Sequence, residues 1–201
     1  MKYIITENQL ERLSQEENIL ELPSLLFFNN DWNLLQKYLE KKGNPKYSIE
    51  GDLDLRNTQI KSLGNLISVG GFLDLRNTPI KSLGNLTSVG GDLDLFNTPI
   101  QSLGNLTSVG GYLSLYNSQI KSLGNLTSVG GDLDLSNTTI ESLGNLTSVG
   151  GYLNLYNTST ESFENLISVG GDLNLKFSPL SIIYTEEKIR NMVEVTGKIY
   201  M

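Results

Sequence analysis

Apolar residues recur along most of this chain in a pattern that repeats every twenty residues, without insertion or deletion, over residues 51–170. In the copy at 71–90, Leu73 and Leu75 lie two apart, which is typical of a strand with one buried face. From Ile80 onward the apolar residues are three apart, which suits a 3₁₀ or polyproline-II-like return. A three-sided β-helix would instead show alternation on every side. The pattern therefore predicts a solenoid with one short parallel strand per coil.

The glycines follow the same period. Six full copies and a degenerate seventh begin at Gly51, Gly71, Gly91, Gly111, Gly131, Gly151 and Gly171. From the second copy onward a glycine pair, such as Gly70-Gly71, precedes the strand, and such a pair permits positive φ and close approach between coils. Gly84 and its equivalents lie in the return, but Glu164 takes this position in the sixth copy. Either positive φ is not required there or the sixth coil is distorted.

The strand and the turn after it resemble a known repeat family. The segment Leu73-Asp74-Leu75-Arg76-Asn77-Thr78-Pro79-Ile80 resembles the L-x-L-x-x-N-x-L segment of leucine-rich repeats, and the return is similar to that of their shortest class. The resemblance covers residues 51–180 and implies an α/β solenoid, a right-handed coil whose strands line a concave side. In one departure, Thr or Ser replaces the ladder asparagine, at Thr58, Thr78, Thr98, Ser118, Thr138 and Thr158. A hydroxyl can still satisfy backbone groups at this turn.

Residues 1–50 break the period and predict a helical N-terminal cap. Thr6-Glu7-Asn8-Gln9 resembles a capping box that opens a helix through about Glu17. A second amphipathic helix is expected from Asp31 to Lys42, and its apolar stripe consists of Trp32, Leu35, Tyr38 and Leu39. A cap is needed because a bare terminal coil would expose core leucines and strand edges.

The opposite end of the solenoid also leaves the repeat pattern. The seventh copy follows the period as far as Leu175, and residues 181–201 predict a C-terminal cap with one short helix. This helix is expected from Thr185 to about Val193, with Ile189, Met192 and Val193 facing inward.

Composition narrows the function classes. The 201 residues include no cysteine and no histidine, which excludes Ser–His or Cys–His pairs and thiolate or imidazole metal ligands. Chemistry with carboxylates alone needs two differentiated acids in a cleft, whereas these aspartates repeat at equivalent positions. The glycines do not form a phosphate-binding G-x-x-x-x-G-K-[ST] loop. We therefore expect a protein without enzymatic activity and without a cofactor.

Net charge and hydropathy limit the classes of partner and the cellular locations that we expect. The net charge is −7, and residues 51–180 hold eleven acidic and six basic residues. A chain of this kind, without Lys/Arg clusters, is not expected to bind nucleic acid. The sequence has no apolar run long enough for a signal peptide or a membrane span. We expect a cytoplasmic protein that does not contact membranes, in a host-cell cytoplasm if its source is viral.

Aromatic residues alternate with the strand leucines and are expected to form columns on the outer face, with about 4.8 Å between strands. These positions vary between copies, while the framework is nearly constant. Six rings are predicted to contact a partner: Phe72, Phe96, Tyr112, Tyr116, Tyr152 and Tyr156. Aromatic residues rimmed by polar groups are typical anchors of protein interfaces. The alternative is that the rings only cover strand backbone.

An acidic column accompanies the rings. Asp54, Asp74 and Asp94 would place like charges opposite one another on neighbouring strands, which is unfavourable. Arg56 and Arg76 are expected to offset this repulsion, and these five residues complete the predicted partner site. A bound cation, with the three aspartates as candidate ligands, or a basic partner would offset it further. Raised carboxylate pKa values are the alternative.

The leading hypothesis is a non-catalytic scaffold that binds another protein on its concave strand face. One alternative is a structural module of a larger viral assembly that docks through its N-terminal helices. Another is a cation- or ice-binding repeat surface, for which four threonines align: Thr87, Thr107, Thr127 and Thr147. The opening MKYIITENQLERL resembles the first residues of small proteins of tailed bacteriophages, which implies a host or virion protein as the partner.

Overall fold

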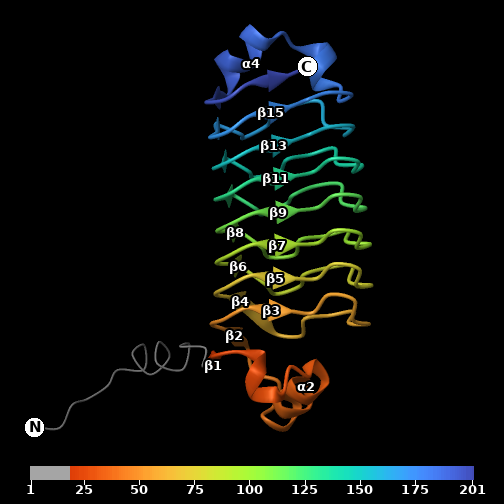
Figure 1. The fold of residues 1–201 in the computed structure, drawn as a ribbon, viewed down its shortest axis with the longest axis vertical. Coiled ribbons are helices and arrows are strands. Elements are labelled where there is room, and N and C mark those ends of the chain that lie inside the picture. Colours follow the sequence, from red (N-terminus) through yellow and green to blue (C-terminus); the bar gives the residue numbers. More distant parts are fainter. Residues whose placement is uncertain (1–18) are drawn as a thin grey trace, which may run out of the picture.

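The computed structural model describes residues 19–201, which form a parallel β-solenoid with short helices at both ends (Figure 1). The helix expected to begin at the capping box, near Thr6, lies outside the described residues. We number the coils 1 to 7 by the glycines that begin the seven sequence copies. The predicted solenoid of twenty-residue coils is confirmed.

The first strand of each coil is the one that the leucine spacing predicts. These strands form an eight-stranded parallel sheet, and in coils 1 to 7 each strand residue pairs with the residue twenty positions away, as Leu73 does with Leu93, while Leu173 pairs with Ile199 of the C-terminal segment. The strands are β3 (Leu53–Asp54), β5 (Leu73–Asp74), β7 (Leu93–Asp94), β9 (Leu113–Ser114), β11 (Leu133–Asp134), β13 (Leu153–Asn154), β15 (Leu173–Asn174) and, from the C-terminal segment, β17 (Ile199–Tyr200).

A second strand, which the sequence did not predict, ends each coil. It belongs to a nine-stranded parallel sheet and is only two residues long in most coils, too short to show a period. Its members are β1 (Leu20–Leu22), β2 (Tyr47–Ile49), β4 (Leu66–Val69), β6 (Ser88–Val89), β8 (Ser108–Val109), β10 (Ser128–Val129), β12 (Ser148–Val149), β14 (Ser168–Val169) and β16 (Glu194–Val195). Both sheets therefore continue into the segments expected to be caps.

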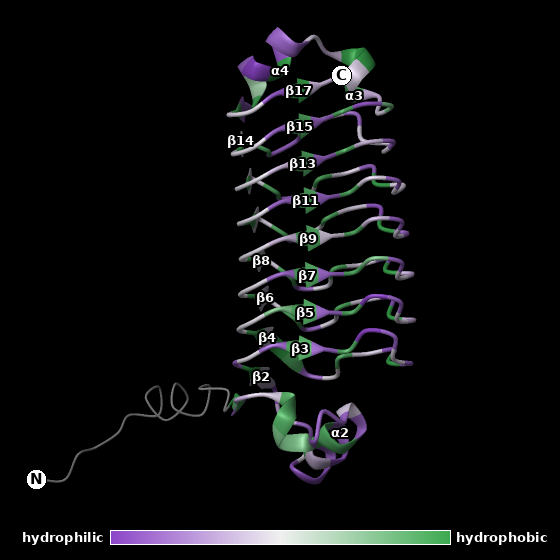
Figure 2. Ribbon diagram, viewed as in Figure 1, coloured by the Kyte–Doolittle hydropathy of each residue, from purple (hydrophilic) through white to green (hydrophobic). Residues whose placement is uncertain are grey.

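The core lies between the two sheets and repeats in every coil. In coil 2, Leu73, Leu75, Ile80, Leu83 and Leu86 are each at most 1% exposed. Figure 2 shows the hydrophobic residues recurring at the same place in successive coils. Because each coil meets its own copies above and below, one well-packed layer is sufficient to specify the whole stack.

The glycine pairs serve close approach and not positive φ. None of the Gly70-Gly71 type of residues has positive φ, but a Cβ on Gly90 would lie 2.2 Å from the carbonyl oxygen of Gly70. Positive φ is instead required in the return, where Gly84 has φ +61°. Glu164 adopts φ 50° at the equivalent position. The sixth coil therefore keeps the turn and carries the strain of a side chain there.

The turn after each first strand is held by side chains. The Thr78 hydroxyl donates to the carbonyl of Leu75 (2.7 Å), so the predicted role of this hydroxyl is confirmed. The asparagine before it adopts positive φ, and amide hydrogen bonds join the equivalent asparagines of neighbouring coils from Asn77 to Asn57 (2.9 Å), from Asn97 to Asn77 and from Asn157 to Asn137. An asparagine ladder thus forms over part of the solenoid, one position earlier than the L-x-L-x-x-N-x-L motif places it.

The coils also alternate, with a true structural period of forty residues. The carboxylate of Asp92 accepts the backbone N–H of Tyr112 in the next coil (2.7 Å), and Asp132 accepts that of Tyr152 (2.7 Å). Coils 2 and 3 instead share a β-bridge in the return, at Ser82–Ser102, and coils 4 and 5 share one at Ser122–Ser142. Aspartate and an aromatic residue alternate in the column formed by positions 52, 72, 92, 112, 132, 152 and 172, which we call the first column. This alternation therefore joins the coils in pairs.

The N-terminal cap contains η1 (Leu25–Phe28) and α2 (Trp32–Lys41). The helix α2 confirms the second predicted helix, and the Asp31 side chain caps it by accepting from the backbone N–H of Asn33 (2.8 Å). Its stripe faces inward, with Trp32, Leu35 and Leu39 buried.

The C-terminal cap contains α3 (Leu180–Ile183) and α4 (Glu186–Met192). Thr185 caps α4 through its side chain, and Ile189 and Val193 are buried as predicted. The inward assignment of Met192 is wrong, because this residue is 39% exposed. Ile189 and Val193 are four residues apart and share the buried face, whereas Met192, three residues after Ile189, lies at the edge of that face.

Candidate partner-binding face

The outer side of the eight-stranded sheet, which we call the strand face, brings together all eleven predicted site residues. The leucines of each strand are buried, and the residues that alternate with them point away from the core. The register places these residues in rows, as for Asp94, Ser114 and Asp134. None of the six predicted rings belongs to the buried core of the described residues.

At coils 1 to 3 of the strand face, two arginines offset the charge of the acidic column. Arg56 lies 2.8 Å from Asp54 and 3.7 Å from Asp74, and Arg76 pairs with Asp74 and with Asp94 (3.3 Å). Each guanidinium therefore bridges two strands of the acidic column, and the predicted offset of its repulsion by these arginines is confirmed. Within the described part of the chain, no group of three or more acidic residues is arranged to hold a metal ion.

The pKa values of this column diverge. Burial raises the pKa of the Asp74 carboxyl, but its hydrogen bonds to Arg76 and the charges of both arginines outweigh burial and lower it overall. Burial raises the pKa of Asp94, and there it prevails over the backbone hydrogen bond from Phe96 and the charge of Arg76. Raised carboxylate pKa values thus describe Asp94 and not Asp74.

At coils 3 to 7 the rings form two pairs. Phe96 stacks on Tyr116, with ring centroids 5.4 Å apart and planes 9° apart. Tyr156 meets Phe177 edge to face, with centroids 5.2 Å apart, and Phe177 is 73% exposed. Phe96 is also exposed (41%), and the contacts within each pair favour fixed ring positions.

Tyr112 and Tyr152 belong to the first column, and their phenols reach the second column, which is formed by positions 54, 74, 94, 114, 134, 154 and 174. Burial raises the pKa of both phenols, and a hydrogen bond to Ser114 or to Asn174, respectively, opposes it. Neighbouring carboxylates raise the two pKa values further; that of Asp134 acts on both phenols. The phenols and the carboxylates therefore form one polar strip between the exposed rings.

Five aspartates of the strand face have no ion-pair partner among the described residues: Asp52, Asp92, Asp132, Asp134 and Asp172. None of them is among the site residues predicted from the sequence. The signal was available, because the column that holds Arg56 and Arg76 has aromatic residues or Ser136 in coils 3 to 6.

A shallow depression of about 470 Å³ lies at the C-terminal end of the strand face. It is lined by Tyr152, Asp172, Asn174, Lys176 and Tyr200. The Lys176 ammonium lies 5.6 Å from the ring centroid of Tyr200, whose hydroxyl donates to Asp172 (3.2 Å). A cation is thus held beside a tyrosine ring and a carboxylate on this face.

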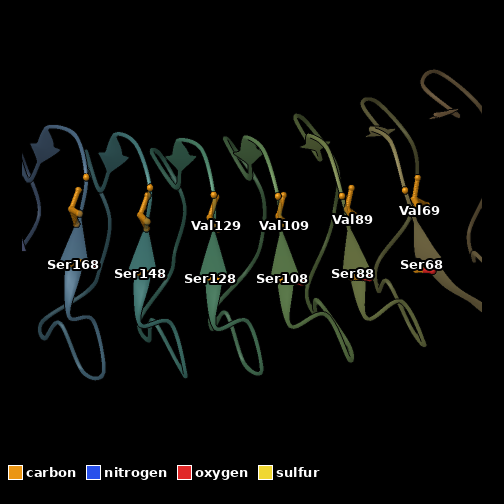
Figure 3. A pocket seen from close by; sticks show the side chains of 18 of the residues that line it. Ser68, Val69, Ser88, Val89, Ser108, Val109, Ser128, Val129, Ser148 and Ser168 are labelled. Carbon is orange, nitrogen blue, oxygen red and sulfur yellow. The ribbon is translucent and has the colours of Figure 1, made fainter. Parts of the chain in front are cut away.

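A second hollow runs along the nine-stranded sheet. It is lined by the Ser-Val-Gly segment of each coil, from Ser68 to Gly170 (Figure 3). These residues are identical in coils 1 to 6, so the hollow repeats the framework and offers no position that differs between coils.

The aligned threonines are engaged within the chain. Thr107 donates its hydroxyl to the carbonyl of Thr87 (3.0 Å), and Thr127 donates to that of Thr107 (2.9 Å). Their hydroxyl protons are therefore used to join the coils.

Comparison of the chain with protein-family models, with curated proteins and with solved structures yields no match. None of the helices in residues 19–201 has the length and apolar character needed to cross a membrane.

Proposed function

We propose that this protein is a non-catalytic binding module and that it holds a partner protein on the strand face. The observation that carries the proposal is a contrast between the two sheets. On the nine-stranded sheet every full coil presents the same Ser-Val-Gly segment, whereas on the strand face charged, aromatic and small residues replace one another from coil to coil. Packing requires only the repeated part.

The composition of the strand face supports a protein partner. Phe72 and Phe96 are 38% and 41% exposed, and aromatic residues with polar neighbours supply most of the binding energy in protein interfaces. The arginine–aspartate bridges hold one end of the face in fixed positions, and the paired rings do the same at the other end. A surface ordered before binding loses less entropy when the partner arrives.

The test is affinity capture from cell lysate with three forms of the protein, followed by direct titration with each captured protein after purification. The first form is the wild type, and the second carries Tyr→Ser at 112, 116, 152 and 156. The third carries Thr→Ser at 87, 107, 127 and 147, a matched control on another side of the coils that keeps the hydroxyl ladder. All three forms must give the same far-UV circular dichroism.

A partner that binds the wild type and the threonine control, but binds the tyrosine variant at least tenfold more weakly (about 1.4 kcal/mol), supports the proposal. Equal binding by all three forms, or the absence of any partner that titrates with the wild type, contradicts it.

A further inference from the structure

Among the described residues, the ion pairs of the strand face end at Asp94 in coil 3. In coils 1 to 3, Arg56 and Arg76 pair with the acidic column. From coil 4 the same column position is occupied by Tyr116, Ser136 and Tyr156, and a cation returns only with Lys176. Asp132 and Asp134, which lie in coil 5, have no ion-pair partner in the described part of the chain.

Coil 5 is the centre of this uncompensated region. Asp134 accepts three hydrogen bonds on Oδ1, from the N–H and hydroxyl of Ser136 and from the amide of Asn154. Asp132 accepts the N–H of Tyr152 on Oδ1. The Oδ2 atom of each carboxylate accepts no hydrogen bond from a described residue. Both carboxylates are therefore oriented by the hydrogen bonds on Oδ1, and each has an Oδ2 atom that can accept a hydrogen bond from a partner.

Tyrosines border coil 5 on both sides. Coil 4 contributes Tyr112 and Tyr116, and coil 6 contributes Tyr152 and Tyr156, while Ser136 between Tyr116 and Tyr156 is only 5% exposed. The third column is formed by positions 56, 76, 96, 116, 136, 156 and 176, and Ser136 is the smallest side chain in it, because the residues there in the other coils are arginine, aromatic or lysine.

In coil 7 a lysine of the chain lies among similar tyrosine and aspartate side chains. There the third column supplies Lys176, which lies over the Tyr200 ring in the depression that Asp172 and Tyr152 also line. The ring in coil 7 comes from the second column, whereas the rings around coil 5 come from the first and third columns. The kinds of group are the same, but at coil 5 none of residues 19–201 supplies an ion pair to Asp132 or Asp134.

We propose that the strand face receives a lysine or arginine side chain at coil 5, from a basic segment of the partner protein. The cation lies against Asp132 and Asp134, between the tyrosines of coils 4 and 6. This inference rests on the proposed function and specifies the chemistry of the partner. Carboxylates supply charge complementarity, and an ammonium or guanidinium on a tyrosine ring adds about 0.5–2 kcal/mol.

The experiment uses the full chain and two fluorescein-labelled twelve-residue peptides, one of alternating Lys and Ser and one of alternating Glu and Ser. Fluorescence anisotropy is measured at low and at moderate salt. The Lys peptide is expected to bind, with an affinity that falls several-fold as salt is raised because the carboxylates are exposed. The Glu peptide is expected not to bind.

Two pairs of variants locate the site. Ser136→Lys places a cation of the chain itself beside Asp134, to which Ser136 now donates its hydroxyl, and should weaken binding of the Lys peptide about tenfold or more. Thr139→Lys adds the same charge at an exposed position of the same coil and should change the affinity less than about twofold. Asp132→Asn with Asp134→Asn should match the loss caused by Ser136→Lys. Glu50→Gln with Glu161→Gln, both exposed, is the charge-matched control.

The inference is overturned if the Lys peptide does not bind, if the Glu peptide binds equally, or if the members of each variant pair behave alike. The asparagine pair keeps the test decisive if Ser136→Lys fails to fold. If a captured partner no longer binds the tyrosine variant but binds the asparagine pair as tightly as the wild type, this inference is overturned and the proposed function stands. If the partner binds both variants as tightly as the wild type, the proposed function itself is contradicted.

Discussion

Gly90→Ala and Gly84→Ala add the same methyl group in one coil and should destabilise the protein by different amounts. At Gly84 no atom lies within 4 Å of the new Cβ, so only the backbone at φ +61° opposes it. Placing an L-residue in this region costs about 1–2 kcal/mol, and the stiffer unfolded chain returns about 0.5–1 kcal/mol. The expected net loss is about 1 kcal/mol.

At Gly90 the backbone itself prevents the substitution. The new Cβ would lie 2.2 Å from the Gly70 carbonyl oxygen, about 1 Å inside ordinary contact. Relief requires the Gly90-Gly91 segment to move away from the Gly70-Gly71 segment, which stretches the hydrogen bonds Gly90 N–H to Val69 O (2.8 Å) and Gly91 N–H to Gly71 O (2.9 Å). Each buried group left unsatisfied costs about 1–3 kcal/mol, so the loss should reach about 3 kcal/mol or more.

Urea unfolding followed by far-UV circular dichroism measures both losses, with Gly110→Ala as a replicate because its Cβ would meet Gly90 O at 2.1 Å. Backbone hydrogen exchange in coils 1 and 2 should increase for Gly90→Ala alone. If Gly90→Ala costs no more than Gly84→Ala, close approach is not the reason for the glycine pairs.

Three further substitutions test other parts of the structure. Leu95→Ala truncates a residue with 0% exposure and should lower the free energy of unfolding by about 2–5 kcal/mol; a loss below about 0.5 kcal/mol would contradict its inward position. Glu164→Gly should stabilise the protein by about 0.5–1 kcal/mol, because φ 50° then carries no side chain, whereas Glu164→Ala should not. Arg76→Met should cost about 1–3 kcal/mol at pH 7 by leaving the buried Asp74 carboxylate short of partners. Because the folded pKa of Asp74 lies below its ordinary value, its contribution is present above about pH 4 and is lost as pH falls through the folded pKa. The difference between the two proteins in urea midpoint should therefore shrink from pH 7 to pH 3, and a difference independent of pH would contradict this reasoning.

The sequence alone determined the solenoid, its period and its first strand. A coil whose neighbours are its own copies has only one partner register, so Leu73 must pair with Leu93 once the period is known. The same logic placed the eleven site residues on one face, because residues that alternate with buried leucines point outward. The helices α2 and α4 were also predictable, since their caps and apolar stripes are local.

Only the tertiary structure decided how neighbouring coils are joined. The second sheet rests on strands as short as Ser88–Val89, which carry no periodic signal, and on glycines whose missing Cβ admits the next backbone. The forty-residue alternation and the bridging by Arg76 depend on contacts between residues about twenty positions apart. Intrinsic preferences along the chain do not report such contacts. For the same reason the unpaired carboxylates of coil 5 emerged only after the structure showed which aspartates the arginines reach.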